Sequence, residues 1–120
     1  MIDRIGQSLS VQGEALKLRS LRQQTLAANL VNAETPGYRA SDFDFAATLQ
    51  ARLRAATPGG AAAHAQPALF ERTSFQPGLD GNTVDADVER ARFADNALRY
   101  EAALRALNGQ IKTLLAAIQA

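Results

Sequence analysis

Hydrophobic residues recur at helical spacing through the first and last parts of this 120-residue chain, and the middle part interrupts the pattern. Residues 1–34 contain no proline, and only Gly6 and Gly13 weaken an otherwise continuous helical stretch. Residues 84–120 carry hydrophobic side chains at alternating steps of four and three, which is the repeat of a coiled coil. The sequence therefore predicts one domain with two long helices, joined by an irregular segment, 35–83.

The apolar residues of the first helix form two stripes rather than one. One stripe carries Ile2, Ile5, Leu9, Leu16 and Leu30, and the other carries Val11, Ala15, Leu18 and Leu26. A helix at the surface of a small domain usually has a single apolar stripe, so two stripes indicate two neighbours. Because the chain contains little material to surround such a helix, we expect surface that the isolated chain leaves open to be covered by other subunits.

The repeat of the last helix defines one continuous seam. Its members are Phe93, Ala97, Tyr100, Leu104, Leu107, Ile111, Leu114 and Ile118. Asp85 is a candidate N-cap, with acidic residues following it near the positive end of the helix. At 1.5 Å per residue this helix would be about 50 Å long, and only the first helix matches it in length. The predicted fold is thus mainly α, with the two terminal helices packed as an antiparallel coiled coil or helical bundle within a helical assembly.

The first helix is expected to end within residues 28–45. Asn32 tolerates the left-handed backbone region and is therefore a candidate helix terminator. Pro36-Gly37 fits the central positions of a type II turn, in which the glycine supplies the positive φ. Thr35 precedes proline and so favours an extended conformation, and Tyr38 can fold its ring back against the helix.

The remainder of the middle segment carries weaker signals. Phe43 and Phe45 alternate with acidic residues as in a short extended stretch, and residues 46–56 suggest a brief helix. Residues 57–68 form a low-complexity linker, and residues 69–79 are a candidate short β segment. We therefore expect an irregular middle that holds little regular structure.

The run Asn29–Arg39, Asn-Leu-Val-Asn-Ala-Glu-Thr-Pro-Gly-Tyr-Arg, closely resembles the signature of the bacterial flagellar rod, hook and hook-associated proteins. Within that family, residues 40–45, 80–85 and 93–96 are similar to those of proximal rod subunits, and the likeness covers roughly residues 1–54 and 79–119. Two separated motifs in the right order make the resemblance specific. It implies a structural subunit of the hollow rod that transmits torque and surrounds the export channel of the flagellar basal body.

The resemblance also implies site residues and partners. The motif residues Asn29, Asn32, Thr35, Pro36, Gly37 and Tyr38 would lie at a subunit contact, and the alternative is an ordinary helix terminus. Phe45 and Leu49 are similar to the Phe-x-x-x-hydrophobe element by which early rod and hook subunits engage the export gate. The implied partners are other copies of the chain, other rod proteins, and the export gate with its rod adaptor.

Charge and composition exclude several classes of function. The net charge is +1, so no long-range field attracts nucleic acid or anionic lipid. No uncharged apolar run approaches the roughly 20 residues that cross a bilayer, so we expect no membrane insertion. The N-terminus lacks the pattern of a secretory signal, which by itself suggests a cytoplasmic protein. The family resemblance instead implies a periplasmic rod protein, exported by the flagellar apparatus without a cleaved signal peptide.

Catalytic and metal-binding chemistry is hard to find in the sequence. There is no cysteine, and the single histidine, His64, lies in the low-complexity linker. Residues 80–85 faintly suggest a calcium loop but lack the oxygen ligand, glycine and glutamate expected at its later positions. We therefore expect no enzyme, no cofactor and no bound metal. A soluble coiled-coil adaptor or export chaperone is the alternative function, and an enzyme is a more distant one.

Overall fold

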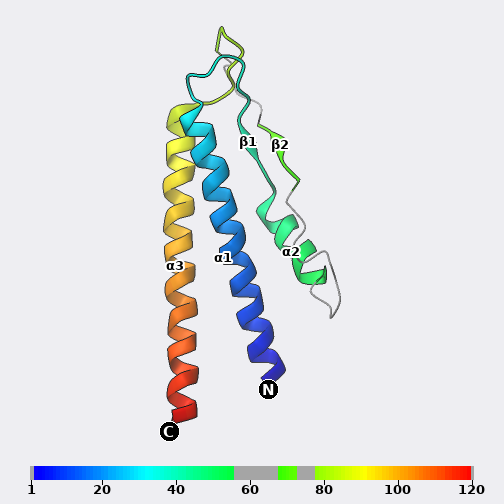
Figure 1. Ribbon diagram of the computed structural model, residues 1–120, viewed down its shortest axis with the longest axis vertical. Coiled ribbons are helices and arrows are strands. Elements are labelled where there is room, and N and C mark those ends of the chain that lie inside the picture. Colours follow the sequence, from blue (N-terminus) through cyan, green and yellow to red (C-terminus); the bar gives the residue numbers. More distant parts are fainter. Residues whose placement is uncertain (1, 56–67, 73–77, 120) are drawn as a thin grey trace.

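The computed structural model describes residues 2–55, 68–72 and 78–119. The elements follow in the order α1 (Ile2–Val31), β1 (Ser41–Asp42), α2 (Phe45–Ala55), β2 (Phe70–Glu71) and α3 (Ala86–Gln119). α1 and α3 lie side by side and antiparallel, so both termini are at the same end of a molecule 64 Å long (Figure 1). The predicted mainly α fold with two packed terminal helices is confirmed. The predictions made for the linker and His64 lie outside the described residues.

The two later helices begin at aspartates that cap them. The Oδ1 atom of Asp85 accepts hydrogen bonds from the backbone N–H groups of Asp87 at 3.2 Å and Val88 at 3.3 Å, as predicted for the start of α3. Asp44 has the same role in α2, since its Oδ1 accepts from the N–H of Ala47 at 3.1 Å. Each cap satisfies donors that have no partner within the helix, which fixes where the chain leaves the middle segment.

The end of α1 differs from the prediction. No residue other than glycine has a positive φ among the described residues, so the left-handed conformation expected for Asn32 is wrong. Its side chain instead donates from Nδ2 to the carbonyl of Ala28 at 2.8 Å and accepts from the hydroxyl of Thr35 at 3.1 Å. The side chain thus satisfies a carbonyl at the helix end directly. Gly37 has a φ of 74°, as the Pro-Gly turn requires.

The middle segment forms an arm with one short sheet. β1 and β2 are antiparallel, with Ser41 opposite Glu71 and Asp42 opposite Phe70. β2 falls within the candidate β segment 69–79, and α2 coincides closely with the brief helix expected at 46–56. The phenylalanine alternation does not mark one strand, because Phe43 follows β1 and Phe45 begins α2. The acidic residue between them caps the helix and so ends the extended stretch.

α1 is the central element, with α3 along one side and the arm of β1 and α2 along the other (Figure 1). Leu18 and Leu26 of α1 are completely buried, and Phe43 of the arm is 2% exposed. The arm reaches down α1 as far as Glu14, whose Oε2 lies 3.5 Å from the guanidinium of Arg52. The two neighbours predicted from the two apolar stripes therefore both belong to this chain over residues 14–31, and the expectation of too little surrounding material is wrong there.

Candidate functional site

A buried polar cluster (Asn29, Asp42, Arg72 and Glu89) joins the upper halves of α1 and α3 to the arm. Asn29 is completely buried, and both the nitrogen and the oxygen of its side-chain amide form two hydrogen bonds each. Its Nδ2 donates to the carbonyl of Ser41 at 2.8 Å and to Glu89 at 3.1 Å. Its Oδ1 accepts from the N–H of Ser41 at 3.0 Å and from the hydroxyl of Tyr38 at 3.3 Å. One asparagine therefore holds together α1, the turn, β1 and α3.

Both carboxylates of this cluster are paired with guanidinium groups. The Asp42 side chain, 4% exposed, lies 2.5 Å from one guanidinium nitrogen of Arg72, and Arg22 and Arg92 approach it at 3.4 and 3.6 Å. A second nitrogen of Arg72 donates to Glu89, which is 2% exposed. Buried carboxylates are costly unless opposite charges and hydrogen bonds surround them. This arrangement meets that requirement with side chains from α1 and α3 and with Arg72, which directly follows β2.

Asn82 holds the turns at the upper end of the molecule. Its side chain is almost fully buried, and its Nδ2 lies 3.0, 3.0 and 2.7 Å from the carbonyl oxygens of Asn32, Ala33 and Thr35. These carbonyls follow the end of α1, where a helix leaves acceptors without partners. Sequence reasoning missed this role, because residues 80–85 stood out only as part of the family likeness and as a faint calcium-loop pattern. The partners lie almost 50 positions earlier, so no local pattern links them.

The upper contact between α1 and α3 is also polar. Asn96 is 2% exposed, and its Nδ2 donates to the carbonyl of Arg19 at 2.9 Å and to the side chain of Gln23 at 2.7 Å. The guanidinium carbon of Arg19 lies 3.9 Å from the ring centroid of Phe45, which is a cation–π contact. Burial, together with the positive charge of Arg99, lowers the pKa of Arg19 below its ordinary value. Polar partners thus fix the register of the two helices here.

The predicted seam residues of α3 differ in exposure along its length. Phe93, Ala97, Tyr100, Leu104, Leu107 and Leu114 are half-buried, whereas Ile111 and Ile118 are 40% and 80% exposed. The fully buried position beside the seam is Asn96 rather than Ala97. The seam is therefore covered toward its upper end and partly open toward the C-terminus.

The residues of the family motif also separate by exposure. Asn29 is buried, Asn32 and Tyr38 are half-buried, and Thr35, Pro36 and Gly37 are exposed at the turn. The two residues of the export-gate element, Phe45 and Leu49, are half-buried on α2. The motif thus combines groups that stabilise this chain with groups that are open to a neighbour.

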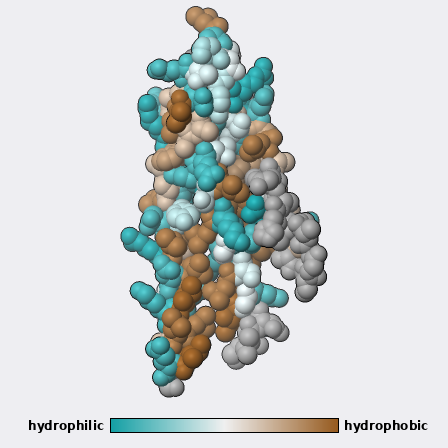
Figure 2. Space-filling view, in the orientation of Figure 1, coloured by the Kyte–Doolittle hydropathy of each residue, from teal (hydrophilic) through white to brown (hydrophobic). Residues whose placement is uncertain are grey.

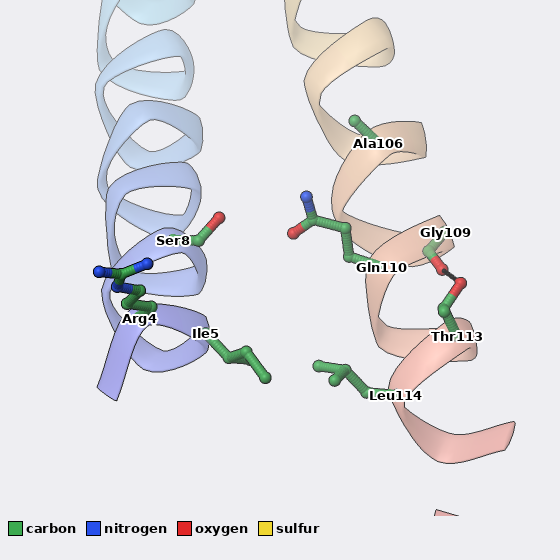
Figure 3. Close-up of a pocket in the computed structure, with 8 residues that line it drawn as sticks. All are labelled: Arg4, Ile5, Ser8, Ala106, Gly109, Gln110, Thr113 and Leu114. Carbon is green, nitrogen blue, oxygen red and sulfur yellow. Dashed lines mark hydrogen bonds between the residues drawn. The ribbon is translucent and has the colours of Figure 1, made fainter. Parts of the chain in front are cut away.

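At the opposite end, the N-terminus of α1 and the C-terminus of α3 diverge and leave a terminal cleft of about 640 Å³. It is lined by Arg4, Ile5, Ser8, Ala106, Gly109, Gln110, Thr113 and Leu114, and Figure 3 shows Ile5 and Leu114 pointing toward each other across it. Val11, Ile111, Leu115 and Ile118 are 40 to 80% exposed on the same part of the two helices. Figure 2 shows hydrophobic surface gathered over this end. Contiguous exposed apolar surface of this kind marks interaction sites.

Comparison with known proteins decides the family. A family model described as "Flagella basal body rod protein" matches residues 9–39, which hold most of α1 and the turn. The chain is 45% identical to the flagellar basal body rod protein FlgB of Escherichia coli K12, and the alignment covers 99% of this chain and 98% of that protein. The chain belongs to the FlgB family of flagellar basal body rod proteins. FlgB of Salmonella typhimurium is also 45% identical, and FlgB of Cereibacter sphaeroides is 43% identical over 92% of this chain.

Membership of the FlgB family makes this chain a structural subunit of the rod in the flagellar basal body, as the sequence motifs predicted. The alignment includes the middle segment, which the motif resemblance left out. A soluble adaptor or chaperone is not favoured, because the relatives are rod proteins. Within the described ranges, no helix has both the length and the apolar character needed to cross a membrane.

Proposed function

We propose that this FlgB-family subunit is built in two parts, a locked upper half and an open end that neighbouring subunits complete when the proximal rod assembles. The observation that carries this proposal is the contrast along α1 and α3. Their upper halves enclose buried polar side chains that are hydrogen-bonded to one another, and their terminal turns leave apolar side chains in water. Hydrophobic surface exposed in the free subunit becomes a driving force for association when neighbours cover it.

The partners in this proposal are other copies of the chain and other rod proteins, in the periplasmic part of the basal body. The seam of α3 would carry torque between them, since Ile111 and Ile118 of the seam stay exposed in the free chain and can contact another subunit. The turn motif would contribute its exposed residues to a contact with a neighbour. Its buried asparagine supports the chain's own fold, so the motif serves both roles.

Export is the second part of the proposal. We infer that the chain passes through the flagellar export apparatus largely unfolded and without a cleaved signal, and that Phe45 and Leu49 engage the export gate and its rod adaptor. In the folded chain Phe45 packs under the guanidinium of Arg19, which supports recognition of the unfolded chain rather than the folded one. The same proposal makes the subunit a structural protein without catalytic activity.

Hydrogen exchange followed by mass spectrometry tests the two-part design. In a dilute monomer we expect the amides of residues 2–12 and 106–119 to exchange rapidly, because few contacts protect those turns. The amides of residues 20–31 and 86–97 should exchange slowly. Full protection of both terminal helices in the monomer would overturn the proposal. Detection of the chain only in the soluble fraction, and not in extracted basal bodies, would favour the adaptor function instead.

A further inference from the structure

A second pocket opens where the arm meets the two long helices. It has a volume of about 500 Å³ and is lined by residues of α1, α3 and the arm. We call it the arm pocket. Its walls combine three guanidinium groups with three phenylalanine rings, which belong to Arg19, Arg22, Arg99, Phe43, Phe45 and Phe70. It shares no lining residue with the terminal cleft.

The three carboxylates that line the arm pocket are already engaged within the chain. Asp42 is shared by three guanidinium groups at 2.5, 3.4 and 3.6 Å. Asp95 accepts a hydrogen bond from Nε of Arg99 at 2.9 Å. Asp44 caps α2 through its Oδ1 atom. Each carboxylate of the pocket thus has a partner other than Arg19.

Arg19 is the guanidinium group of the pocket that has no carboxylate partner among the described residues. Its Nη1 atom has only a long contact, 3.5 Å, with Oδ1 of Asn96. The groups that line the pocket or pair with its lining include five arginines and four acidic residues: Arg19, Arg22, Arg72, Arg92, Arg99, Asp42, Asp44, Glu89 and Asp95. One positive charge is therefore left uncompensated.

The surroundings of Arg19 make this charge costly. Burial is the main reason why the pKa of Arg19 lies below its ordinary value, the positive charges of Arg99 and Arg22 lower it further, and Asp95 offsets them only in part. A guanidinium group that is removed from water without a carboxylate loses hydration that the chain does not fully replace. A carboxylate brought in from outside would supply what is missing.

The position of Arg19 leaves donors accessible for such a partner. The ring of Phe45 lies 3.9 Å from the guanidinium carbon and so occupies one side of the group. A guanidinium group has five N–H donors in its plane, and only one of them reaches Asn96. The remaining donors match the two oxygens of a carboxylate, which arginine can bind through two parallel hydrogen bonds.

The apolar part of the site indicates what carries the carboxylate. Phe70 lines the pocket and is 50% exposed, and its neighbour in sequence, Leu69, is 60% exposed. A small free anion would neutralise Arg19 but leave these side chains in water. An acidic side chain that stands beside an apolar residue on another protein would satisfy both, since exposed apolar surface favours protein contacts and charge pairs orient them.

We propose that the arm pocket receives an Asp or Glu side chain of a neighbouring subunit in the rod, with the carboxylate on Arg19 and an adjoining apolar residue against Phe70. The proposal rests on the rod function and specifies one of its contacts. Arg19 contributes little to the fold of the free chain and gains its partner on docking. A neighbour without the carboxylate, or one out of register, would bury Arg19 unpaired, so the pocket also selects the correct neighbour.

Arg19→Met tests the contact in the rod, because methionine keeps a long unbranched side chain without the charge. The matched control is Arg54→Met, since Arg54 is exposed on α2 and has no ion pair within the described ranges. In cells that make only the variant chain, we expect at least tenfold less Arg19→Met than control in isolated basal bodies, with equal amounts exported. The Tm of purified Arg19→Met should stay within about 8 °C of the native value, because the lost charge had no partner.

Three results of this experiment would overturn the contact. The first is a native amount of Arg19→Met in basal bodies. The second is a larger fall in Tm, which would show that the guanidinium group supports the chain's own fold. The third is a loss of export, which would show that Arg19 acts before assembly.

A titration of the purified native chain tests the pocket without the rod. NMR would follow the Nε–Hε resonance of Arg19, identified by its absence from Arg19→Met, while sodium acetate replaces sodium chloride at constant ionic strength. We expect a saturable shift of this resonance and none for Arg54. Equal responses of the two arginines would refute the carboxylate site and leave the rod function standing. Absence of the native chain from basal bodies would refute the rod function, and the acetate titration would then decide the pocket by itself.

Discussion

The substitution Asn82→Ala removes the side chain that binds the turn at residues 78–82 to the end of α1. The amide of Asn82 reaches three backbone carbonyls through Nδ2 and accepts a hydrogen bond from the N–H of Val84 at 2.7 Å through Oδ1. Alanine retains none of these contacts. The side chain is almost fully buried, so water cannot replace the lost partners without local opening.

The expected loss of stability follows from these contacts. Two N–H donors and one acceptor are lost, and each net hydrogen bond contributes about 1 kcal/mol, so the free energy of unfolding should fall by about 3 kcal/mol. For a chain of this size, 1 kcal/mol corresponds to a change in Tm of about 4 °C. We therefore expect Tm to fall by about 12 °C. The loss should be local in origin, with faster amide exchange at residues 32–38.

Thermal unfolding followed by far-UV circular dichroism measures this change. The matched control is Asn108→Ala, because Asn108 is exposed on α3 and has no such contacts in the described structure. The control should leave Tm nearly unchanged or raise it slightly, since alanine favours helix. If the free energy of unfolding of Asn82→Ala lies within about 0.5 kcal/mol of that of the control, Asn82 does not hold the upper end together.

Three other predictions concern the seam, the backbone and the buried charges. Leu107→Glu should prevent rod assembly and abolish swimming, whereas the control His64→Ala should not alter swimming. Normal motility of the Leu107→Glu variant would show that the seam is not an assembly surface. Gly37→Ala should lower the free energy of unfolding by about 1–2 kcal/mol, because φ is 74° there. Gly13→Ala within α1 should raise it by up to about 1 kcal/mol. Urea unfolding that found the Gly37 variant more stable than the Gly13 variant would contradict this. Glu89→Ala should lower the free energy of unfolding by about 3 kcal/mol in the same assay, since Arg72 keeps only one of its two buried carboxylate partners and Asn29 loses an acceptor. A loss below about 1 kcal/mol would mean that water replaces the carboxylate.

Sequence periodicity was sufficient to predict the two long helices, but not the short strands or the buried polar side chains that connect them. Helical spacing predicted α1 and α3, and Asp85 predicted the start of α3, because helix formation depends on neighbours a few positions away. The strands have two residues each, too few for an alternating pattern to be recognised. Asn96 illustrates a second limit. The heptad pattern selects apolar positions and so assigned Ala97 to the seam, while the polar residue one position earlier is the one that is buried.

The polar groups that join the two long helices were hidden for the same reason. The burial of Asn29 or Glu89 is not evident until the distant partners are known, and those partners come from the turn, β1, the residue after β2 and the other helix. Asn32 shows how a local rule can choose wrongly. Both a left-handed backbone and a side-chain hydrogen bond can end a helix, and the sequence does not distinguish them. The Pro-Gly turn was predictable because glycine has a strong local preference there.

The polar contact between the upper halves of α1 and α3 has a mechanical consequence. Torque on a shaft shears neighbouring helices along their axes, and a slip by one helical turn is about 5.4 Å. Apolar side chains can exchange partners during such a slip with modest loss, because dispersion contacts have little directionality. The amide of Asn96 cannot, since a shift of that size takes it away from the carbonyl of Arg19 and the side chain of Gln23. The carboxylate of Glu89 would likewise lose its hydrogen bond from Asn29. We therefore expect the upper half to resist sliding, and deformation under torque to be concentrated in the turns near the termini.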